Sequence, residues 1–208
     1  MRWKRKRTIV VLACLAIGSA MGGVAIWLND YPVHHFSVVR EGVLYRSGQP
    51  DPGQLRRLVD RYGIRTVVNL RGQRTEDVWW RGETAFCNKR VLHMKNIEMG
   101  EGAAALANIG EFLDIVGDPA NRPVLVHCEA GSARTGFAVA AYRIVVDGWS
   151  YEKAMDEALT FHFKMDHSTN KEYQQILRHL ADARVQGGTT FPGSQRQGKE
   201  PRTEDAGS

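Results

Sequence analysis

The chain has 208 residues, enough for one domain of about 150 residues with its own core and an extension at each end. Its formal charge is +5, but five basic residues lie before residue 8, and the rest of the chain carries 23 basic and 23 acidic side chains. The excess positive charge therefore belongs to the N-terminal tail (1–8), and the composition excludes an extended basic surface of the kind that binds nucleic acids.

Residues 9–28 form an uncharged, mostly apolar run of 20 residues. As a helix this run would extend about 30 Å, the thickness of the hydrocarbon core of a bilayer. The basic tail before it predicts that the chain after Leu28 lies on the far side of the membrane. Gly18-Ser19-Ala20 faintly resembles a cleavage site, so a cleaved signal peptide is the alternative. Because the run continues to Trp27, we favour an uncleaved transmembrane anchor.

The first half of the remaining chain alternates short apolar runs with amphipathic segments. Residues 29–42 indicate a linker, and a strand follows at 43–46. Asp51 as N-cap with Gln54 three residues later predicts a helix, which Gly63 ends. Further on we expect strands at 66–70 and 91–96, helices at 75–88 and 106–117, and a loop at 97–102.

The second half begins with a buried strand at 123–127. The helix expected at 135–146 is apolar nearly all round, which predicts a central position. Ser150 predicts the N-cap of the next helix, and Thr169-Asn170-Lys171-Glu172 is a capping box that would open the last one. Residues 186–208 are too poor in apolar residues to fold, so we expect a disordered tail after a domain that covers 29–185.

Strands therefore alternate with helices from about residue 43 to 147, and helices alone follow. This order predicts an α/β fold with a mostly parallel central sheet flanked by helices. Ligands in such sheets bind beyond the carboxyl ends of the strands. The loop after the strand at 123–127 would lie there.

That loop is the most informative stretch of the chain, and it reads Cys128-Glu129-Ala130-Gly131-Ser132-Ala133-Arg134-Thr135-Gly136. Backbone N–H groups of a tight loop that leads into a helix N-terminus bind anions. The same groups, together with Arg134, would favour the thiolate form of Cys128. A guanidinium can also grip two oxygens of a tetrahedral oxyanion. A thiolate that faces a bound phosphate predicts hydrolysis of phosphate esters.

His127-Cys128-x5-Arg134-Thr135-Gly136 resembles the signature loop of the cysteine-dependent protein tyrosine and dual-specificity phosphatases. Residues 42–50 and 66–71 are similar to a bacterial exported branch of that family, and the resemblance covers roughly 36–180. It implies a dual-specificity-phosphatase-like fold, with Cys128 as nucleophile and Arg134 as phosphate clamp. It also implies that the Thr135 hydroxyl hydrogen-bonds the sulfur, although Thr135 as a plain helix N-cap is an alternative. The implied substrate-binding residues are Glu129, Ala130, Gly131, Ser132, Ala133 and Arg134.

The chemistry also needs an acid that protonates the leaving oxygen. The family uses an aspartate on a loop before the cysteine, and here the sequence departs from that pattern. The loop at 97–102 offers only Glu98 and Glu101. Glu101 lies between two glycines that would let it move, so we favour Glu101 as general acid over Glu98.

Cys87 is expected to be a small buried residue, with a Cys87–Cys128 disulfide as the alternative. The histidines show no metal-ligand spacing, so we expect no metal ion or other cofactor. The loop between Cys128 and Arg134 has no lysine, whereas the phosphoinositide phosphatases of this superfamily tend to carry lysines there. Together with the acidic Glu129, this favours phosphotyrosine in proteins, with Arg71 and Lys164 as candidate rim contacts.

Two other functions remain open at this stage. One is a pseudophosphatase that binds phosphorylated proteins without turnover, which the missing aspartate suggests. The other is a rhodanese-type sulfurtransferase, whose loop usually differs by one residue in its Cys-to-Arg spacing. If residues 9–28 are an anchor, the chain is expected in the bacterial inner membrane with its catalytic domain in the periplasm, or in the periplasm or medium after signal cleavage.

Overall fold

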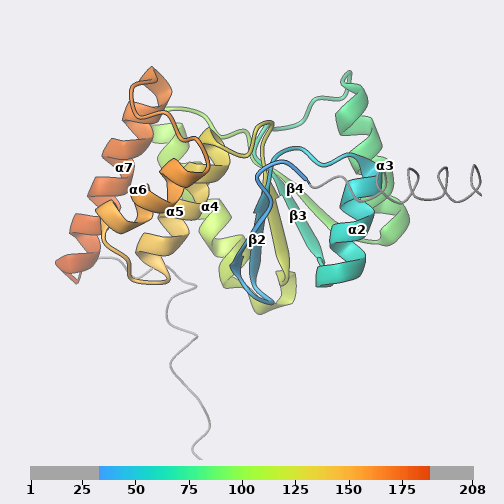
Figure 1. The fold of residues 1–208 in the computed structure, drawn as a ribbon, viewed down its shortest axis with the longest axis horizontal. Helices are drawn as coiled ribbons and strands as arrows, with labels where there is room; N and C mark the ends of the chain where they lie inside the picture. Colours follow the sequence, from blue (N-terminus) through green and yellow to red (C-terminus); the bar gives the residue numbers. More distant parts are fainter. Residues whose placement is uncertain (1–32, 188–208) are drawn as a thin grey trace, which may run out of the picture. The chain divides into compact units, whose positions relative to one another are not determined.

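A five-stranded sheet forms the centre of the domain (Figure 1). The computed structural model describes residues 33–187. Its strands are β1 (Ser37–Arg40), β2 (Leu44–Ser47), β3 (Thr66–Asn69), β4 (His93–Asn96) and β5 (Val124–His127). They lie in the order β1-β2-β5-β3-β4, and all pairs are parallel except β1 with β2. The predicted α/β fold with a mostly parallel sheet is confirmed.

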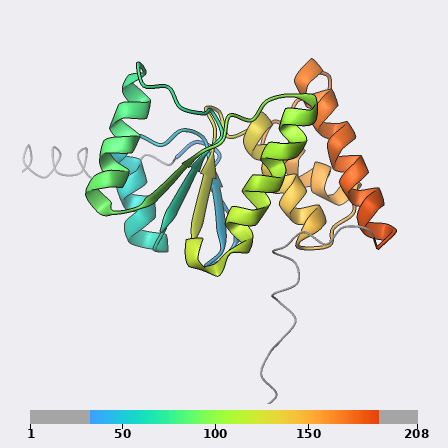
Figure 2. The same ribbon diagram turned by 180° about the vertical axis from the view of Figure 1, so that it is seen from behind.

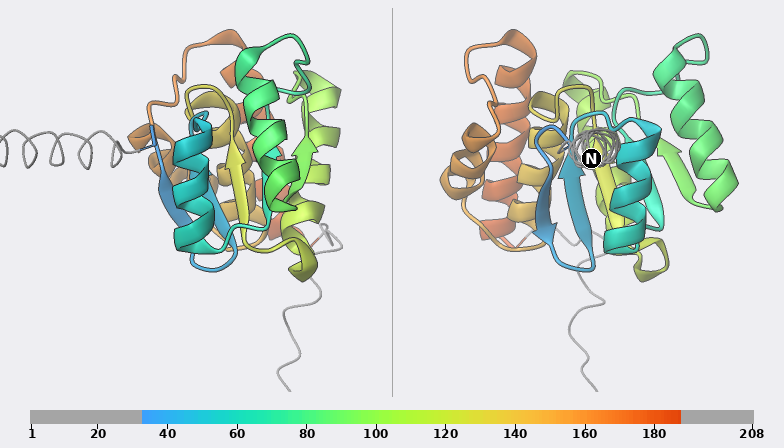
Figure 3. Two further views of the ribbon diagram at one scale, coloured as in Figure 1. Left: turned by 90° about the vertical axis from the view of Figure 1, so that its right-hand side faces the viewer. Right: turned by 45° about the vertical axis from the view of Figure 1, so that its right-hand side comes forward.

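Helices cover both faces of this sheet. They are α2 (Pro52–Tyr62), α3 (Val78–Arg90), α4 (Gly102–Gly117), α5 (Ala133–Val145), α6 (Tyr151–Thr160) and α7 (Ser168–Val185), with a 3₁₀ turn η1 (Pro119–Asn121). Helices α4 to α7 gather on one face (Figure 2), and α2 and α3 stand beside each other on the opposite face (Figure 3). Among residues 33–187, no helix combines the length and apolar character needed to cross a bilayer.

Side chains along the buried strands point alternately to the two faces of the sheet, and each face has its own hydrophobic core. In β5, Val124 and Val126 belong to the core shared with α4 to α7, whereas Leu125 packs in the core beneath α2 and α3. Val68 and Val67 of β3 divide in the same way. Successive side chains of a strand point to opposite faces, so a sheet covered on both faces needs a continuous apolar run. The short apolar runs of the sequence meet that need.

Local capping fixes two of the helix starts as predicted. The Asp51 carboxylate accepts the Gln54 N–H at 2.7 Å, and the Gln54 side chain accepts the Asp51 N–H at 2.9 Å. Gly63 ends this helix with φ of 65°. At the start of α6, the Ser150 hydroxyl accepts the Lys153 N–H at 3.2 Å.

Several predicted boundaries were wrong. Strand β1 lies within the segment predicted as a linker, and it escaped prediction because only one of its four residues, Val39, is buried. Helix α3 begins at Val78, three residues later than predicted, and α5 begins at Ala133, two residues earlier. The predicted anchor at 9–28 and nearly all of the predicted tail lie outside the described residues.

Candidate active site

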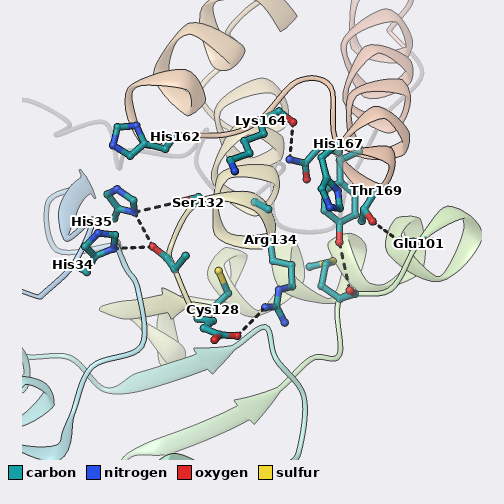
Figure 4. Close-up of a pocket in the computed structure, with 16 residues that line it drawn as sticks. His34, His35, Glu101, Cys128, Ser132, Arg134, His162, Lys164, His167 and Thr169 are labelled. Atoms are coloured by element: carbon teal, nitrogen blue, oxygen red, sulfur yellow. Dashed lines mark hydrogen bonds and ion pairs between the residues drawn. The ribbon is translucent and has the colours of Figure 1, made fainter.

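The loop that joins β5 to α5 lies at the carboxyl ends of the parallel strands, where His127 is paired with Ser47 of β2 and Asn69 of β3. A cavity of about 640 Å³ lies against this loop (Figure 4). The cavity is lined by residues from the loop, from the segment before β1, from the loop before α4 and from the chain around the start of α7. This is the position that the strand and helix pattern predicted for a ligand site.

Cys128 lies in the wall of the cavity and is only 2% exposed. The Gly131 N–H donates to its Sγ at 3.3 Å. The preceding side chain points to the other face of the sheet, where His127 Nε2 lies 2.8 Å from Glu83 Oε1 of α3. His127 therefore connects the start of the loop to a helix on the far side of the sheet.

The alternative Cys87–Cys128 disulfide is not formed, and both thiols are free. Cys87 belongs to the core beneath α2 and α3, whereas Cys128 belongs to the core on the opposite face. Burial raises the pKa of the Cys87 thiol to about 12, so Cys87 stays protonated at neutral pH. Its role is that of a small buried residue, as predicted.

The turn after β2 supports the loop from behind. Gly131 has φ of 76°, and a Cβ atom built on it would lie 2.6 Å from the backbone nitrogen of Gly48. The Gly131 carbonyl accepts a hydrogen bond from Nη2 of the buried Arg46 at 2.6 Å. The Gln49 N–H donates to the Glu129 carbonyl at 2.9 Å. This close packing explains why residues 42–50 belong to the same pattern as the loop.

Arg134 lies in the first turn of α5 and also lines the cavity. One oxygen of the exposed Glu129 carboxylate is 4.0 Å from Nη2 of Arg134 and 3.5 Å from Nη2 of Arg71. The Arg71 guanidinium is stacked 3.7 Å above the ring of Trp79. An acidic group therefore lies beside the predicted phosphate clamp, and Arg71 holds it from outside the cavity.

The two candidate acids occupy different environments. Glu101 lines the cavity and accepts a hydrogen bond from the Thr169 hydroxyl. Glu98 is not among the lining residues, and its carboxylate pairs with Arg74 at 2.6 Å. The structure thus brings Glu101, and not Glu98, to the side of the cavity that contains Arg134.

Helix α7 fixes the loop that carries Glu101. The Glu172 carboxylate accepts the Gly102 N–H at 2.8 Å, and the Tyr173 hydroxyl donates to the Gly100 carbonyl at 3.1 Å. The capping box predicted at 169–172 was wrong, because these side chains bind the loop before α4 and His167 occupies the N-cap. Burial raises the pKa of Tyr173 to about 12, so its hydroxyl remains a donor.

The observed contacts of Thr135 differ from those predicted. It lies within the first turn of α5, behind the N-cap Ser132, so it is not the N-cap itself. Its buried hydroxyl has no hydrogen-bond partner among the described residues, so the predicted bond to the sulfur is not formed in this structure. Of the predicted binding loop, Gly131 does not line the cavity, whereas the following residues do: Glu129, Ala130, Ser132, Ala133 and Arg134.

Sequence reasoning missed most of the basic side chains at the cavity. They are His34, His35, His162 and His167, while Lys164 was predicted as a rim contact. The first two come from the segment interpreted as a linker, and the others from the connection between α6 and α7. No spacing in the sequence links residue 34 to residue 162, so only the folded chain reveals the group.

Comparison with known proteins agrees with this geometry. A family model described as DSP-PTPase phosphatase fused to NAD+ kinase matches residues 33–177. The chain belongs to this DSP-PTPase family. The family match covers both the loop from Cys128 to Thr135 and the supporting turn at 42–50.

Two individual relatives are named as phosphatases of different substrate classes. Dual specificity protein phosphatase TpbA of Pseudomonas aeruginosa is 34% identical over 120 residues, which are 55% of this chain and 49% of the relative. Inositol diphosphatase SIW14 of Saccharomyces cerevisiae is 25% identical over 150 residues, 70% of this chain and 51% of the relative. The chain thus spans about half the length of these curated relatives.

Solved structures extend the likeness to the fold. The core catalytic domain of PP-IP phosphatase SIW14 from S. cerevisiae superposes with a TM-score of 0.62 at 25% identity, over 75% of this chain and 91% of that one. The crystal structure of P. aeruginosa TpbA gives a TM-score of 0.53 at 26% identity, over 69% of this chain and 86% of that one. The DSP-PTPase fold is therefore shared across the domain that holds the cavity.

Proposed function

We propose that this DSP-PTPase chain is a phosphoric monoester hydrolase, a protein tyrosine and dual-specificity phosphatase that uses Cys128 as its nucleophile. The observation that carries the proposal is the arrangement at the cavity. Cys128 Sγ receives the Gly131 N–H at 3.3 Å, and Arg134 lines the same cavity from the first turn of α5. A nucleophile next to a clamp for a tetrahedral oxyanion suits phosphoryl transfer.

In the first proposed step, the Cys128 thiolate attacks the phosphorus atom. A sulfur–phosphorus bond forms and the ester oxygen–phosphorus bond breaks, while Glu101 gives its proton to the leaving oxygen. Arg134 binds two of the non-bridging oxygens of the phosphate. These oxygens replace the Glu129 carboxylate as the partner of its guanidinium. The product of this step is the free alcohol and a phosphocysteine.

In the second proposed step, a water molecule attacks the phosphocysteine. Glu101, now a carboxylate, takes a proton from the water, the sulfur–phosphorus bond breaks, and inorganic phosphate leaves with the thiolate restored. Thr169 suits both steps, because its hydroxyl can accept from the protonated acid or donate to the carboxylate. Thr135 would ease the departure of the sulfur once its hydroxyl turns toward it.

The substrate class rests on the loop and on the relatives. The five residues between Cys128 and Arg134 include no lysine, and Glu129 is acidic, which favours phosphotyrosine in proteins with phosphoserine and phosphothreonine as further substrates. TpbA is named a dual specificity protein phosphatase, which agrees with this assignment. SIW14 is named an inositol diphosphatase, so a test must include both substrate classes.

The Cys128→Ser variant tests the nucleophile and the turnover together. We expect wild-type protein to release phosphate from a phosphotyrosine peptide, and Cys128→Ser to bind the peptide without releasing phosphate. Binding without turnover by the wild-type protein with a free Cys128 thiol would instead support the pseudophosphatase. The sulfurtransferase alternative predicts thiosulfate–cyanide activity, and the DSP-PTPase family match gives it no support.

Glu101→Gln and Glu98→Gln form a matched pair that tests the acid. Loss of the acid should lower kcat on a phosphotyrosine peptide by roughly 10²-fold or more, and by less on an aryl phosphate with a good leaving group. Glu98→Gln should retain its rates on both substrates, because its carboxylate pairs with Arg74 instead of lining the cavity. Full activity of Glu101→Gln on the poor leaving group would refute the assignment.

We further propose that residues 9–28 anchor the chain in the bacterial inner membrane, with the phosphatase domain in the periplasm. The supports are the uncharged run of 20 residues and the basic cluster before it. A reporter enzyme that is active only in the periplasm, fused after Leu28, should be active. Retention of the fusion in washed membranes distinguishes an anchor from a cleaved signal peptide, and a reporter active only in the cytoplasm would contradict the proposal.

A further inference from the structure

The cavity is more basic than the loop that carries Cys128. The loop supplies Arg134 alone, but the chain outside it adds a lysine and four histidines, shown around the cavity in Figure 4. His167 and Lys164 come from the connection between α6 and α7. Three further imidazoles, of His34, His35 and His162, gather at the opposite side of the loop. We call these three the histidine cluster.

The histidine cluster is compact and is attached to the loop. The ring centroids of His34 and His35 are 3.8 Å apart, and those of His35 and His162 are 5.2 Å apart. Nδ1 of His34 and Nδ1 of His35 lie 3.1 Å and 2.7 Å from the Ala130 carbonyl oxygen. A carbonyl only accepts, so each Nδ1 must carry the hydrogen and each Nε2 remains to take up a second proton. Protonation of these rings therefore preserves their bonds to the loop.

The histidine cluster has no counter-charge within the described chain. No carboxylate there lies within ion-pair distance of the three rings. Burial lowers the pKa of His35, and the nearby charges of His34, His162 and the Arg46 guanidinium lower it further, against the opposing hydrogen bond to Ala130. An anion beside these rings would relieve that repulsion.

The carboxylates near the cavity are already engaged with other groups. Glu129 lies between Arg71 and Arg134, and Glu101 accepts from Thr169. Glu157, which interacts with Arg46 through space, is paired with Arg143 at 2.7 Å. Within residues 33–187, no group of three His, Cys, Asp or Glu side chains has the arrangement needed to hold a metal ion. The cluster thus suits an anion and not a cation.

We propose that the histidine cluster is a second anion subsite of the cavity, which binds an additional anionic group of a substrate whose scissile phosphate ester lies on the loop. The proposal rests on the proposed phosphatase function and deepens it. A cavity of about 640 Å³ is large enough for a substrate of drug-like size that carries both groups. The preferred substrates are therefore phosphate esters with a second negative group, and the basic side chains that the loop lacks come from other segments.

The same proposal gives a pH dependence with a defined sign. A bound anion favours the charged form of an imidazole, so anion binding takes up protons and becomes tighter as the pH falls through the range in which histidines titrate. Because the pKa of His35 is lowered in the free protein, the gain continues below pH 6.5. The probe must keep a constant charge over this range, which a sulfonate does.

The test compares two aryl phosphates that differ only in a sulfonate substituent. For the full chain we expect the KM of the sulfonated compound to be about fivefold lower at pH 5.5, the size of a partly exposed charge contact, with a smaller difference at pH 7.5. The effect of the sulfonate on the acidity of the phosphate and of the leaving phenol belongs to the compounds, so it cancels when the KM ratio of the full chain is compared with that of a histidine variant. Equal KM values at both pH values, with normal turnover, would overturn the subsite and leave the phosphatase function intact.

His162→Asn is the informative variant. His162 has φ of 61°, a backbone conformation that asparagine tolerates, and no hydrogen bond joins its side chain to the loop. We expect this variant to lose the preference for the sulfonated compound. His93→Asn is the matched control and should keep the preference. His93 is exposed and lies at the first position of β4, whereas the cavity lies at the carboxyl ends of the strands. An unchanged preference in His162→Asn would contradict the role of the cluster.

Direct binding separates this proposal from the question of turnover. In Cys128→Ser, the sulfonated compound should bind more tightly than its parent, and adding His162→Asn should remove the difference. Absence of hydrolysis by the wild-type protein would refute the phosphatase function without affecting this result. A second pair consists of two phosphotyrosine peptides, one with aspartate and one with asparagine beside the phosphotyrosine. This pair shows whether the subsite binds a second anionic group in peptides as well as in small molecules. If neither the sulfonated compound nor the aspartate peptide binds more tightly than its partner, the subsite proposal is wrong.

Discussion

Arg46 is a fully buried charge that donates a hydrogen bond to the loop. It is 1% exposed, its guanidinium lies 3.8 Å from the centre of the Phe161 ring, and its Nη2 donates to the Gly131 carbonyl. Burial lowers its pKa to about 10, while Glu157 and Cys128 oppose this change, so Arg46 stays charged at neutral pH. Two of its nitrogens have no hydrogen-bond partner in the described chain. Burying a charge costs free energy, and we explain this cost by the role of Arg46 in positioning the loop and in placing a positive charge close to it.

Replacing Arg46 by methionine tests this at the level of one residue. Methionine fills a similar volume without the charge or the hydrogen bond to Gly131, so the loop should shift and kcat should fall on the order of 10²-fold, the cost of a misplacement of about 1 Å at a reacting centre. Steady-state kinetics on an aryl phosphate measure the change, with thermal unfolding to verify the fold. Arg56→Met, on the exposed side of α2, should retain full kcat. Equal rates for Arg46→Met and Arg56→Met would show that Arg46 has no such role.

At this scale, the sequence predicted the residues whose chemistry depends on local spacing. Cys128 and Arg134 are separated by five residues in one loop, and the structure brings both to the cavity. The contacts of Arg46, Thr169 and the histidine cluster were not predicted, because each is made with a residue more than 65 positions away in the chain. Such contacts depend on the packing of whole elements, and composition and periodicity carry no information about them.

Helix α7 acts as the support of the loop that carries Glu101. Three contacts from the start of α7 join them: Thr169 to Glu101, Glu172 to the Gly102 N–H, and Tyr173 to the Gly100 carbonyl. The Tyr173 ring is in turn stacked on Phe137 of α5 with centroids 4.2 Å apart. The flexible loop inferred from two glycines is therefore fastened on its helix side, which limits how far Glu101 can move.

Thr169→Val tests whether this attachment aims the acid. Valine has nearly the same shape but no hydroxyl, so Glu101 loses its partner while α7 keeps its packing. We expect kcat on a phosphotyrosine peptide to fall about tenfold, a part of the 10²–10⁴ that a positioned acid contributes, and to change little on an aryl phosphate with a good leaving group. A uniform loss on both substrates would instead indicate general damage to the site. Ser168→Ala, the exposed neighbour, serves as the control.

The elements themselves were predicted well wherever a cap or a buried run defined them. The capping boxes at 51–54 and 169–172 look alike in sequence, yet only the first forms. The second box does not form because Thr169 and Glu172 of α7 make hydrogen bonds with the loop before α4 instead of capping their own helix. β1 was missed for a related reason, because an edge strand with a single buried residue lacks the apolar run that marks the other strands.

Considered as a whole, the domain places its site where two distant backbone segments touch. The turn at 47–49 and the loop at 129–131 follow neighbouring parallel strands, β2 and β5, and approach so closely that a side chain at Gly131 would clash and one at Gly48 would be tight. A Cβ on Gly48 would lie 3.0 Å from the Glu129 carbonyl oxygen, and one on Gly131 would lie 2.6 Å from the Gly48 nitrogen. The α/β pattern predicted that the loop after β5 lies at the carboxyl ends of the strands, but not its contact with the turn after β2, because strand order is not contained in the pattern.

Gly131→Ala and Gly42→Ala separate this contact from ordinary backbone strain. Both glycines have positive φ, 76° and 69°, so each substitution should lower the free energy of unfolding by roughly 1–2 kcal/mol. Only Gly131 has backbone atoms in the space that a Cβ would fill, whereas nothing lies within 4 Å at Gly42. Gly131→Ala must therefore push the loop away from Gly48, and we expect kcat to fall on the order of 10²-fold in this variant alone. Denaturant unfolding and steady-state kinetics on the same preparations provide the comparison. If Gly42→Ala lost as much activity as Gly131→Ala, the contact between the two loops would not be what sets the geometry of Cys128.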